Sequence, residues 1–289
     1  MRLHLYTIVL DGMPFLPMHL ANFNRLPESV DWHWSVAEGA AMSIACTRWC
    51  RAQSPRLSKD GTTEFLRTLK GHPRVTVHQR PMWFGKVEMV NTCLQDFTRP
   101  GIVLEVDADE IWLPNQLMLL MDLFTAFPEI GSAHFFCRYF VGHNIIITTK
   151  DSYGNRPTEW ARCWRWTPKL RAISHEPPIM DGLTGTCASR EHTQSLGLVF
   201  DHLSWVYERQ AESKGSFYGY REAVKGWRRL QANKVWPCEL NQFLPWVDPG
   251  VQANVLWKLN STAFSDAQAT FLPRSRLSNM RSPRVAKPA

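Results

Sequence analysis

The sequence lacks the long apolar run that a membrane-spanning helix requires, since no window approaches ~18 consecutive apolar residues. The first apolar stretch reaches Asp11 after too few residues to form the hydrophobic region of a signal peptide. Hydrophobic residues make up 44% and charged residues 20% of the 289 residues, as is ordinary for globular proteins. We therefore expect a cytoplasmic protein without a transmembrane segment, for which peripheral contact with a membrane stays open.

Signatures of several enzyme classes are also missing. The sequence has no phosphate-binding loop with its lysine, no Gly-x-Gly-x-x-Gly after a strand and no Gly-x-Ser-x-Gly. These absences argue against kinase-like, dinucleotide-dependent and serine-hydrolase functions.

The seven cysteines are an odd number, and Cys46 and Cys50 have no second pair at zinc-binding spacing, which favours free thiols. The net charge is +7, but the sequence has no run of five or six basic residues, so we expect no nucleic-acid partner.

Strand and helix patterns alternate through the first 126 residues. Short apolar, β-branched segments predict strands at 3–10, 32–37, 74–78 and 101–106, and amphipathic segments predict helices at 15–26, 63–70, 86–97 and 114–126. This order predicts an α/β fold with a mostly parallel sheet and helices on both of its faces. Ligands bind beyond the carboxyl ends of the strands in such sheets.

The pattern changes after residue 131. A mixed region follows, with antiparallel strands predicted at 132–141 and 144–149, a rigid loop at 174–178, a strand at 195–200, and helices at 203–213 and 217–233. Residues 271–289 are rich in Arg, Pro and Ser, which predicts a disordered basic tail.

The sharpest chemical feature is Asp107-Ala108-Asp109-Glu110, which follows a buried strand. Alternate residues of a strand point the same way, so Asp107 and Asp109 are expected to converge on one divalent ion. Carboxylates suit Mn²⁺ or Mg²⁺, and few protein ligands are needed where phosphates complete the metal shell. The alternative is an acidic turn at the start of helix 114–126.

The chain resembles the family 2-type glycosyltransferases with the GT-A fold over about residues 3–205, and within them a less-studied branch. The resemblance rests on Leu10-Asp11-Gly12-Met13-Pro14-Phe15, Glu38-Gly39, Asp60-Gly61-Thr62, Lys86 with Met89 and Asn91, and Val106 through Trp112. It implies a GT-A-like domain at 1–205, with a nucleotide-sugar half at 1–112 and an acceptor half at 113–205. A C-terminal helical extension is expected at 206–270. The resemblance also implies a nucleotide-diphosphate sugar as the donor.

The resemblance assigns roles around the donor. Glu38 matches the acidic residue that contacts the nucleobase or ribose, but Asp60 lies in a similar Asp-Gly motif, so both stay open. Asp11 is expected either at the edge of the base or only in a turn. Lys86 opens a predicted helix, where an ammonium suits a diphosphate, although it could equally be a surface lysine.

The remaining assignments concern catalysis and the metal. A histidine from a late strand often closes the metal site of this fold, and His202 is the first candidate, with His175 as its rival. We assign Glu176 as the catalytic base, together with Asp109 as a catalytic residue. Asp181 and Asp201 are alternatives for the base, and a retaining mechanism would need none.

The sequence thus predicts a metal-dependent glycosyltransferase. Two alternatives stay open, a metal-dependent phosphoryl or nucleotidyl transferase and a non-catalytic protein that binds an anionic polymer. The sequence does not decide the sugar, the nucleotide or the acceptor, which could be a glycan, a lipid-linked molecule or a protein.

Overall fold

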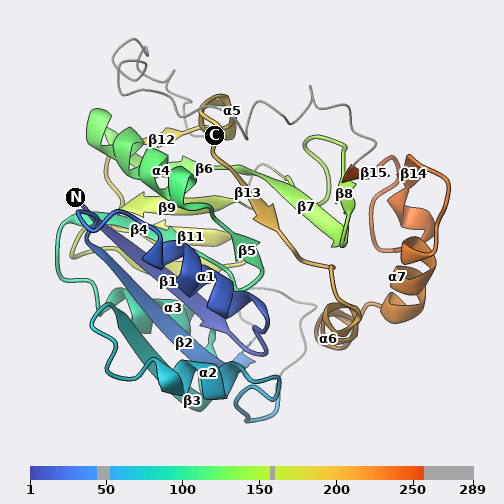
Figure 1. The fold of residues 1–289 in the computed structure, drawn as a ribbon, viewed down its shortest axis with the longest axis horizontal. Coiled ribbons are helices and arrows are strands. Elements are labelled where there is room, and N and C mark those ends of the chain that lie inside the picture. Colours follow the sequence, from blue (N-terminus) through green and yellow to red (C-terminus); the bar gives the residue numbers. More distant parts are fainter. Residues whose placement is uncertain (44–52, 157–159, 257–289) are drawn as a thin grey trace.

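The computed structural model describes residues 1–43, 53–156 and 160–256 of the chain. Its two larger β-sheets lie beside each other, and a two-stranded sheet is formed by a separate hairpin (Figure 1). The larger has seven strands in the order β12-β6-β9-β4-β1-β2-β3, and the smaller has six in the order β14-β15-β8-β7-β13-β5. The predicted tail at 271–289 lies outside the described residues.

The larger sheet is parallel in its N-terminal half. β1 pairs in parallel with both β2 and β4, and β2 pairs in parallel with β3. β9 then runs antiparallel to both β4 and β6, so the sheet as a whole is mixed. The strands are β1 (Arg2–Val9), β2 (Trp32–Ser43), β3 (Val75–Gly85), β4 (Gly101–Glu105), β6 (Ile130–His134), β9 (Ala161–Arg165) and β12 (Thr186–Ala188).

Helices cover both faces of this sheet, as predicted. Alternate residues of a strand face opposite sides, so Leu5 packs in one apolar core while Tyr6 packs in the other. The first core also takes in Phe23 of α1, and the second takes in Met89 of α3. The helices are α1 (Phe15–Asn24), α2 (Thr62–Thr68), α3 (Lys86–Leu94) and α4 (Pro114–Ala126).

β2 is longer than predicted, and this changes the position of Glu38. The strand does not end at Glu38 but continues to Ser43, past an irregularity in its pairing with β3. Gly39 permits this course, because it has φ +142° and a Cβ there would lie 1.8 Å from the carbonyl oxygen of Arg80. Glu38 therefore lies within a strand and not at a strand end.

The smaller sheet is assembled from distant parts of the chain. β5 (Glu110–Ile111) begins at the last residue of the acidic motif and pairs antiparallel with β13 (Val199–His202). The strand predicted at 132–141 is divided between β6 in the larger sheet and β7 (Phe136–Gly142) in the smaller one, and only β7 pairs antiparallel with β8 (Ile145–Ile147). β15 (Gln252–Val255) pairs with β8, and β14 (Cys238–Glu239) pairs with β15.

The C-terminal part contains more than helices. Helices α6 (Glu208–Tyr218) and α7 (Ala223–Gln231) occur near the predicted positions, and a short 3₁₀ helix (Leu240–Gln242) precedes β15. Helix α5 (Arg190–Ser195) was not predicted. The expectation of a purely helical extension is corrected by β14 and β15, which join the smaller sheet.

The loop predicted at 174–178 is the turn of a hairpin. β10 (Arg171–His175) and β11 (Pro178–Asp181) pair antiparallel on either side of it. The side-chain amide of Asn91 in α3 donates to the carbonyl oxygen of Ala172 at 3.0 Å and accepts from its N–H at 2.8 Å. This double contact fixes the hairpin to α3.

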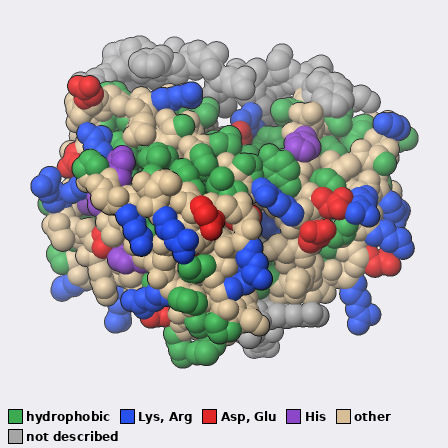
Figure 2. Space-filling view, turned by 60° about the horizontal axis from the view of Figure 1, so that its bottom comes forward, with side chains coloured by type: hydrophobic (Ala, Val, Ile, Leu, Met, Phe, Trp, Pro, Cys, Tyr) green, Lys and Arg blue, Asp and Glu red, His purple; other side chains and the backbone are tan. Residues whose placement is uncertain are grey.

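The described part of the chain has no helix long and apolar enough to cross a membrane. On the face drawn in Figure 2, Lys and Arg side chains are scattered among acidic and apolar ones and do not gather in a single stripe.

Candidate active site

A cleft of about 960 Å³ lies at the carboxyl ends of β1 and β4. Its lining includes the loop after β1, the loop before α2, the start of α3, the loop after β4, the β10–β11 turn, the end of β13, and α6. Asp11, Asp60, Lys86, Asp107, Asp109, His175, Glu176 and His202 all line it. The structure therefore brings together every predicted site residue except Glu38.

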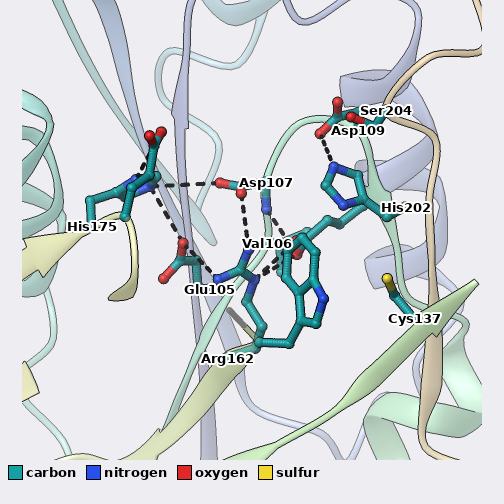
Figure 3. A network of polar contacts seen from close by, with 12 residues as sticks. Glu105, Val106, Asp107, Asp109, Cys137, Arg162, His175, His202 and Ser204 are labelled. Atoms are coloured by element: carbon teal, nitrogen blue, oxygen red, sulfur yellow. Dashed lines mark hydrogen bonds and ion pairs between the residues drawn. The ribbon is translucent and has the colours of Figure 1, made fainter. Parts of the chain in front are cut away.

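Asp109 lies with His202 on one side of the acidic motif (Figure 3). Its Oδ1 is 3.3 Å from Nε2 of His202, and its Oδ2 is 3.5 Å from Nζ of Lys214. Burial raises the pKa of Asp109, but the charge of Lys214 and the contact with His202 outweigh it and hold the pKa well below its usual range. Burial lowers the pKa of His202, which favours the neutral imidazole that metals bind.

Asp107 lies on the other side of the motif, near His175. Its Oδ1 is 3.8 Å from Nε2 of His175, which in turn is 3.4 Å from Oε1 of Glu105. The ligand atoms of these three residues all lie within 4.8 Å of one another. Among the described residues, neither ring nitrogen of His175 has a hydrogen-bond partner. This group is a second place where a cation could bind.

Arg162 joins the acidic groups beneath the cleft. Its guanidinium is 2.8 Å from Glu110, 3.3 Å from Asp107 and 3.4 Å from Glu105. Arg162 and both glutamates are buried, and Tyr6 donates a further hydrogen bond to Glu105 at 2.5 Å. Sequence reasoning did not predict this network.

Glu176 lies in the β10–β11 turn and is paired with Lys86 across the cleft wall. Burial raises the pKa of Glu176, but the charge of Lys86 outweighs it and lowers the pKa to about 2. The alternative bases lie elsewhere. Asp181 is exposed and paired with Arg171, and Asp201 is paired with Arg138, and neither lines the cleft.

Glu38 is enclosed behind the cleft. It has no exposed surface, and it accepts hydrogen bonds from the N–H of Ser58 at 3.0 Å, from Thr63 at 2.5 Å and from Gln79 at 2.7 Å. A carboxylate with this set of donors orders the loop that contains Ser58, and it has no surface to offer a nucleotide. Because β2 continues past Glu38, the expected position at a strand end does not apply.

Asp11 and Asp60 organise the loops at the cleft mouth. Asp11 makes a two-point contact with Arg56, at 3.1 and 2.6 Å. Asp60 accepts from the N–H of Met13 at 2.8 Å and from that of Thr62 at 3.1 Å. Both carboxylates tie the loop after β1 to the loop before α2, and both line the cleft.

The chain is similar to solved structures but to no sequence family. No protein-family model and no curated protein sequence matches the chain. S. aureus TarS 1-349 in complex with UDP-GlcNAc is 13% identical with a TM-score of 0.39, over 57% of this chain and 45% of that one. The mannosyltransferase PcManGT from Pyrobaculum calidifontis, in complex with GDP-Man and Mn²⁺, is 22% identical with a TM-score of 0.34, over 47% and 36%. The chain matches less than half of the length of either structure.

Proposed function

We propose that the chain is a metal-dependent glycosyltransferase that uses a nucleotide-diphosphate sugar. The observation that carries the proposal is the cleft beyond β1 and β4, in which Asp107 and Asp109 face a histidine each and which Lys86 also lines. Parallel sheets bind ligands at this edge, and a diphosphate leaving group needs the positive charge that a metal ion and a lysine supply. We also retain the proposed GT-A-like domain at 1–205 with its division at residue 112.

The donor set around Asp109 fits a divalent cation. A carboxylate oxygen and an imidazole nitrogen 3.3 Å apart match two neighbouring ligands of one ion, whose bonds are about 2.1 Å long. Both side chains line the cleft, where a cation would meet a diphosphate, whereas Glu105 of the second group does not. We therefore propose Asp109 and His202 as ligands, with Asp107 alongside. The ion would neutralise charge on the departing diphosphate.

Lys86 and Glu176 are proposed to act together. While they are paired, the lowered pKa makes Glu176 a weak base. A diphosphate that accepts a hydrogen bond from the ammonium of Lys86 would draw the ammonium away from Glu176. The pKa of the Glu176 carboxylate would then rise. Glu176 would in that state be suited to take the proton of an acceptor hydroxyl.

Asp60, not the enclosed Glu38, is the carboxylate that we propose for the nucleobase end, with Asp11 beside it.

A panel of nucleotides tests this function directly. We expect a nucleoside diphosphate with Mn²⁺ to raise the melting temperature by about 5 to 10 °C at about 100 times its dissociation constant. UDP, GDP, CDP and ADP, and the four corresponding triphosphates, would each be tested with Mn²⁺ and with EDTA, by differential scanning fluorimetry. A response confined to nucleoside triphosphates would favour a nucleotidyl transferase. DNA binding that persists in Asp109→Ala would favour the anionic-polymer binder.

Two histidine variants separate the two possible metal groups. We expect His202→Ala to weaken Mn²⁺ affinity about 10- to 100-fold in the presence of the nucleoside diphosphate, because it removes a ligand of the proposed ion. His175→Ala should slow transfer and leave Mn²⁺ affinity nearly unchanged.

The exposed His143 provides a matched control in His143→Ala, since it does not line the cleft. Mn²⁺ titrations by calorimetry would give all three affinities. If His175→Ala is the variant that loses the metal, the ion binds at Glu105, Asp107 and His175, and the assignment to His202 is wrong.

A further inference from the structure

One whole face of α6 lines the cleft. The cleft residues of this helix are Arg209, Gln210, Ser213, Lys214, Phe217 and Tyr218. They recur at intervals of four, which places them on one side of the helix over three successive turns. The other side is used for packing, since Ala211 is buried and Glu208 pairs with Arg228 of α7. The helix therefore presents a continuous polar and aromatic face to the space above the acidic motif.

This face makes three contacts across the cleft. Arg209 donates a hydrogen bond to the carbonyl oxygen of Met13, in the loop after β1. Lys214 is 3.5 Å from Asp109 and donates to the hydroxyl of Ser204. The ring of Phe217 lies 5.3 Å from the ammonium of Lys86. The helix is thus held against the three elements that surround the proposed diphosphate position.

Lys214 and Lys86 occupy matching situations. Each ammonium reaches the cleft and is paired there with a carboxylate that we assign to the reaction, Asp109 for Lys214 and Glu176 for Lys86. The side chain of Lys214 is 23% exposed and that of Lys86 is 25% exposed, so both are open to a ligand in the cleft.

We propose that Lys214 binds the diphosphate of the donor and exchanges Asp109 for a phosphate oxygen when a divalent cation occupies Asp109. The exchange follows from charge. An ammonium and a divalent cation repel each other when both contact the same carboxylate. Lys214 must therefore leave Asp109 when the ion binds there. A phosphate oxygen bound near the same ion would be the closest new anion, and a lysine with four methylene groups can turn towards it.

This inference rests on the proposed function. It predicts that removing the ammonium of Lys214 changes the affinity for Mn²⁺ and the affinity for a nucleoside diphosphate in opposite directions. Lys214 competes with the cation for Asp109 when no nucleotide is present, but it assists the nucleotide once the cation is bound. Removal of the ammonium should therefore strengthen Mn²⁺ binding to the free protein and weaken nucleoside diphosphate binding. A lysine that only supports the fold would not move the two affinities in opposite directions.

The experiment compares Lys214→Met with the wild-type protein by calorimetry. With saturating Mn²⁺, we expect the affinity for UDP or GDP, whichever the wild type binds, to fall about 10- to 100-fold, as for a lost charge-assisted hydrogen bond. The affinity for the corresponding nucleoside should change less than twofold. Without nucleotide, the affinity for Mn²⁺ should increase.

Two further variants control the result. Lys214→Arg keeps the charge and should retain most of the diphosphate affinity, which would show that the charge at this position is what binds. An unchanged melting temperature of Lys214→Met without ligands would exclude misfolding as the cause of its loss. Lys225→Met removes an exposed lysine that pairs with Glu222 outside the cleft, and it should change neither affinity.

The outcomes separate the two proposals. If the wild type binds a nucleoside diphosphate and Lys214→Met binds it equally well, the inference on Lys214 is wrong and the proposed function stands. A parallel loss of Mn²⁺ and diphosphate affinity would also overturn the exchange, because it would mean that Lys214 supports the metal site. If the wild type binds none of the four nucleoside diphosphates with Mn²⁺, both the proposed function and this inference fail.

Discussion

Asp109→Asn should lower the Mn²⁺-dependent affinity for a nucleoside diphosphate by more than about 100-fold, beyond the effect of removing groups that only orient metal ligands. Asp109 is the carboxylate that faces His202 at 3.3 Å and also lines the cleft. An amide has nearly the same shape but supplies no negative charge, so the site would lose its attraction for a divalent cation. Calorimetric titration of the nucleotide, with Mn²⁺ and with EDTA, measures the loss.

The fold should survive this substitution, because the amide can still accept a hydrogen bond from His202. Asp122→Asn, on α4 and away from the cleft, is a control of the same chemistry. Circular dichroism and melting curves of the two variants should agree with those of the wild type. If Asp109→Asn binds Mn²⁺ and nucleotide normally, the metal does not depend on this residue and the proposed function loses its main support.

The arrangement of the first four strands could be predicted from the sequence because each is an apolar segment. All five residues of β4 are buried, and strands covered on both faces read as continuous apolar runs. The lengths of β2 and β3 were underestimated because both continue through polar residues beyond the apolar run. Those residues are tolerated because Glu38 and Gln79 hydrogen-bond to each other at 2.7 Å.

The acidic motif follows a buried strand, as predicted, but the directions of its two aspartates differ from the prediction. The alternation rule applied to Asp107 and Asp109 holds only while the strand continues, and β4 ends at Glu105. The N–H of Glu110 then donates to the carbonyl oxygen of Asp107 at 2.9 Å, which closes a turn. The two carboxylates consequently meet different histidines.

Lys214 and Arg162 could not be assigned from sequence because their partners are distant along the chain. Lys214 meets Asp109 across 105 positions, and Arg162 meets Glu110 across 52. Helix periodicity would have placed Lys214 on a face with Gln210 and Tyr218, but it gives no information on which element that face covers. Only the packing of α6 over the acidic motif decides this.

Arg162→Met is expected to lower the free energy of unfolding by about 3–5 kcal/mol, which corresponds to about 6 to 20 °C in melting temperature. Arg162 is 3% exposed, and its buried partners Glu105 and Glu110 are 1% and 0% exposed. A methionine fills similar space but leaves both carboxylates without their cation, and the lost pairing is costly where water cannot replace it. Differential scanning calorimetry measures the change.

The pH dependence of this loss gives an independent check on its cause. Burial raises the pKa of both Glu105 and Glu110, so the folded chain holds more protons than the unfolded chain between the two sets of pKa values. Stability therefore falls as the pH rises through that window, and the deficit of Arg162→Met should shrink in acid, where both carboxyls are protonated.

Adding Glu110→Gln to Arg162→Met should restore part of the stability at neutral pH, because it removes one unpaired charge. Arg171→Met, which breaks an exposed pair with Asp181, should leave the melting temperature nearly unchanged. An equal deficit at every pH, with no recovery in the double variant, would show that Arg162 contributes by packing and not by charge.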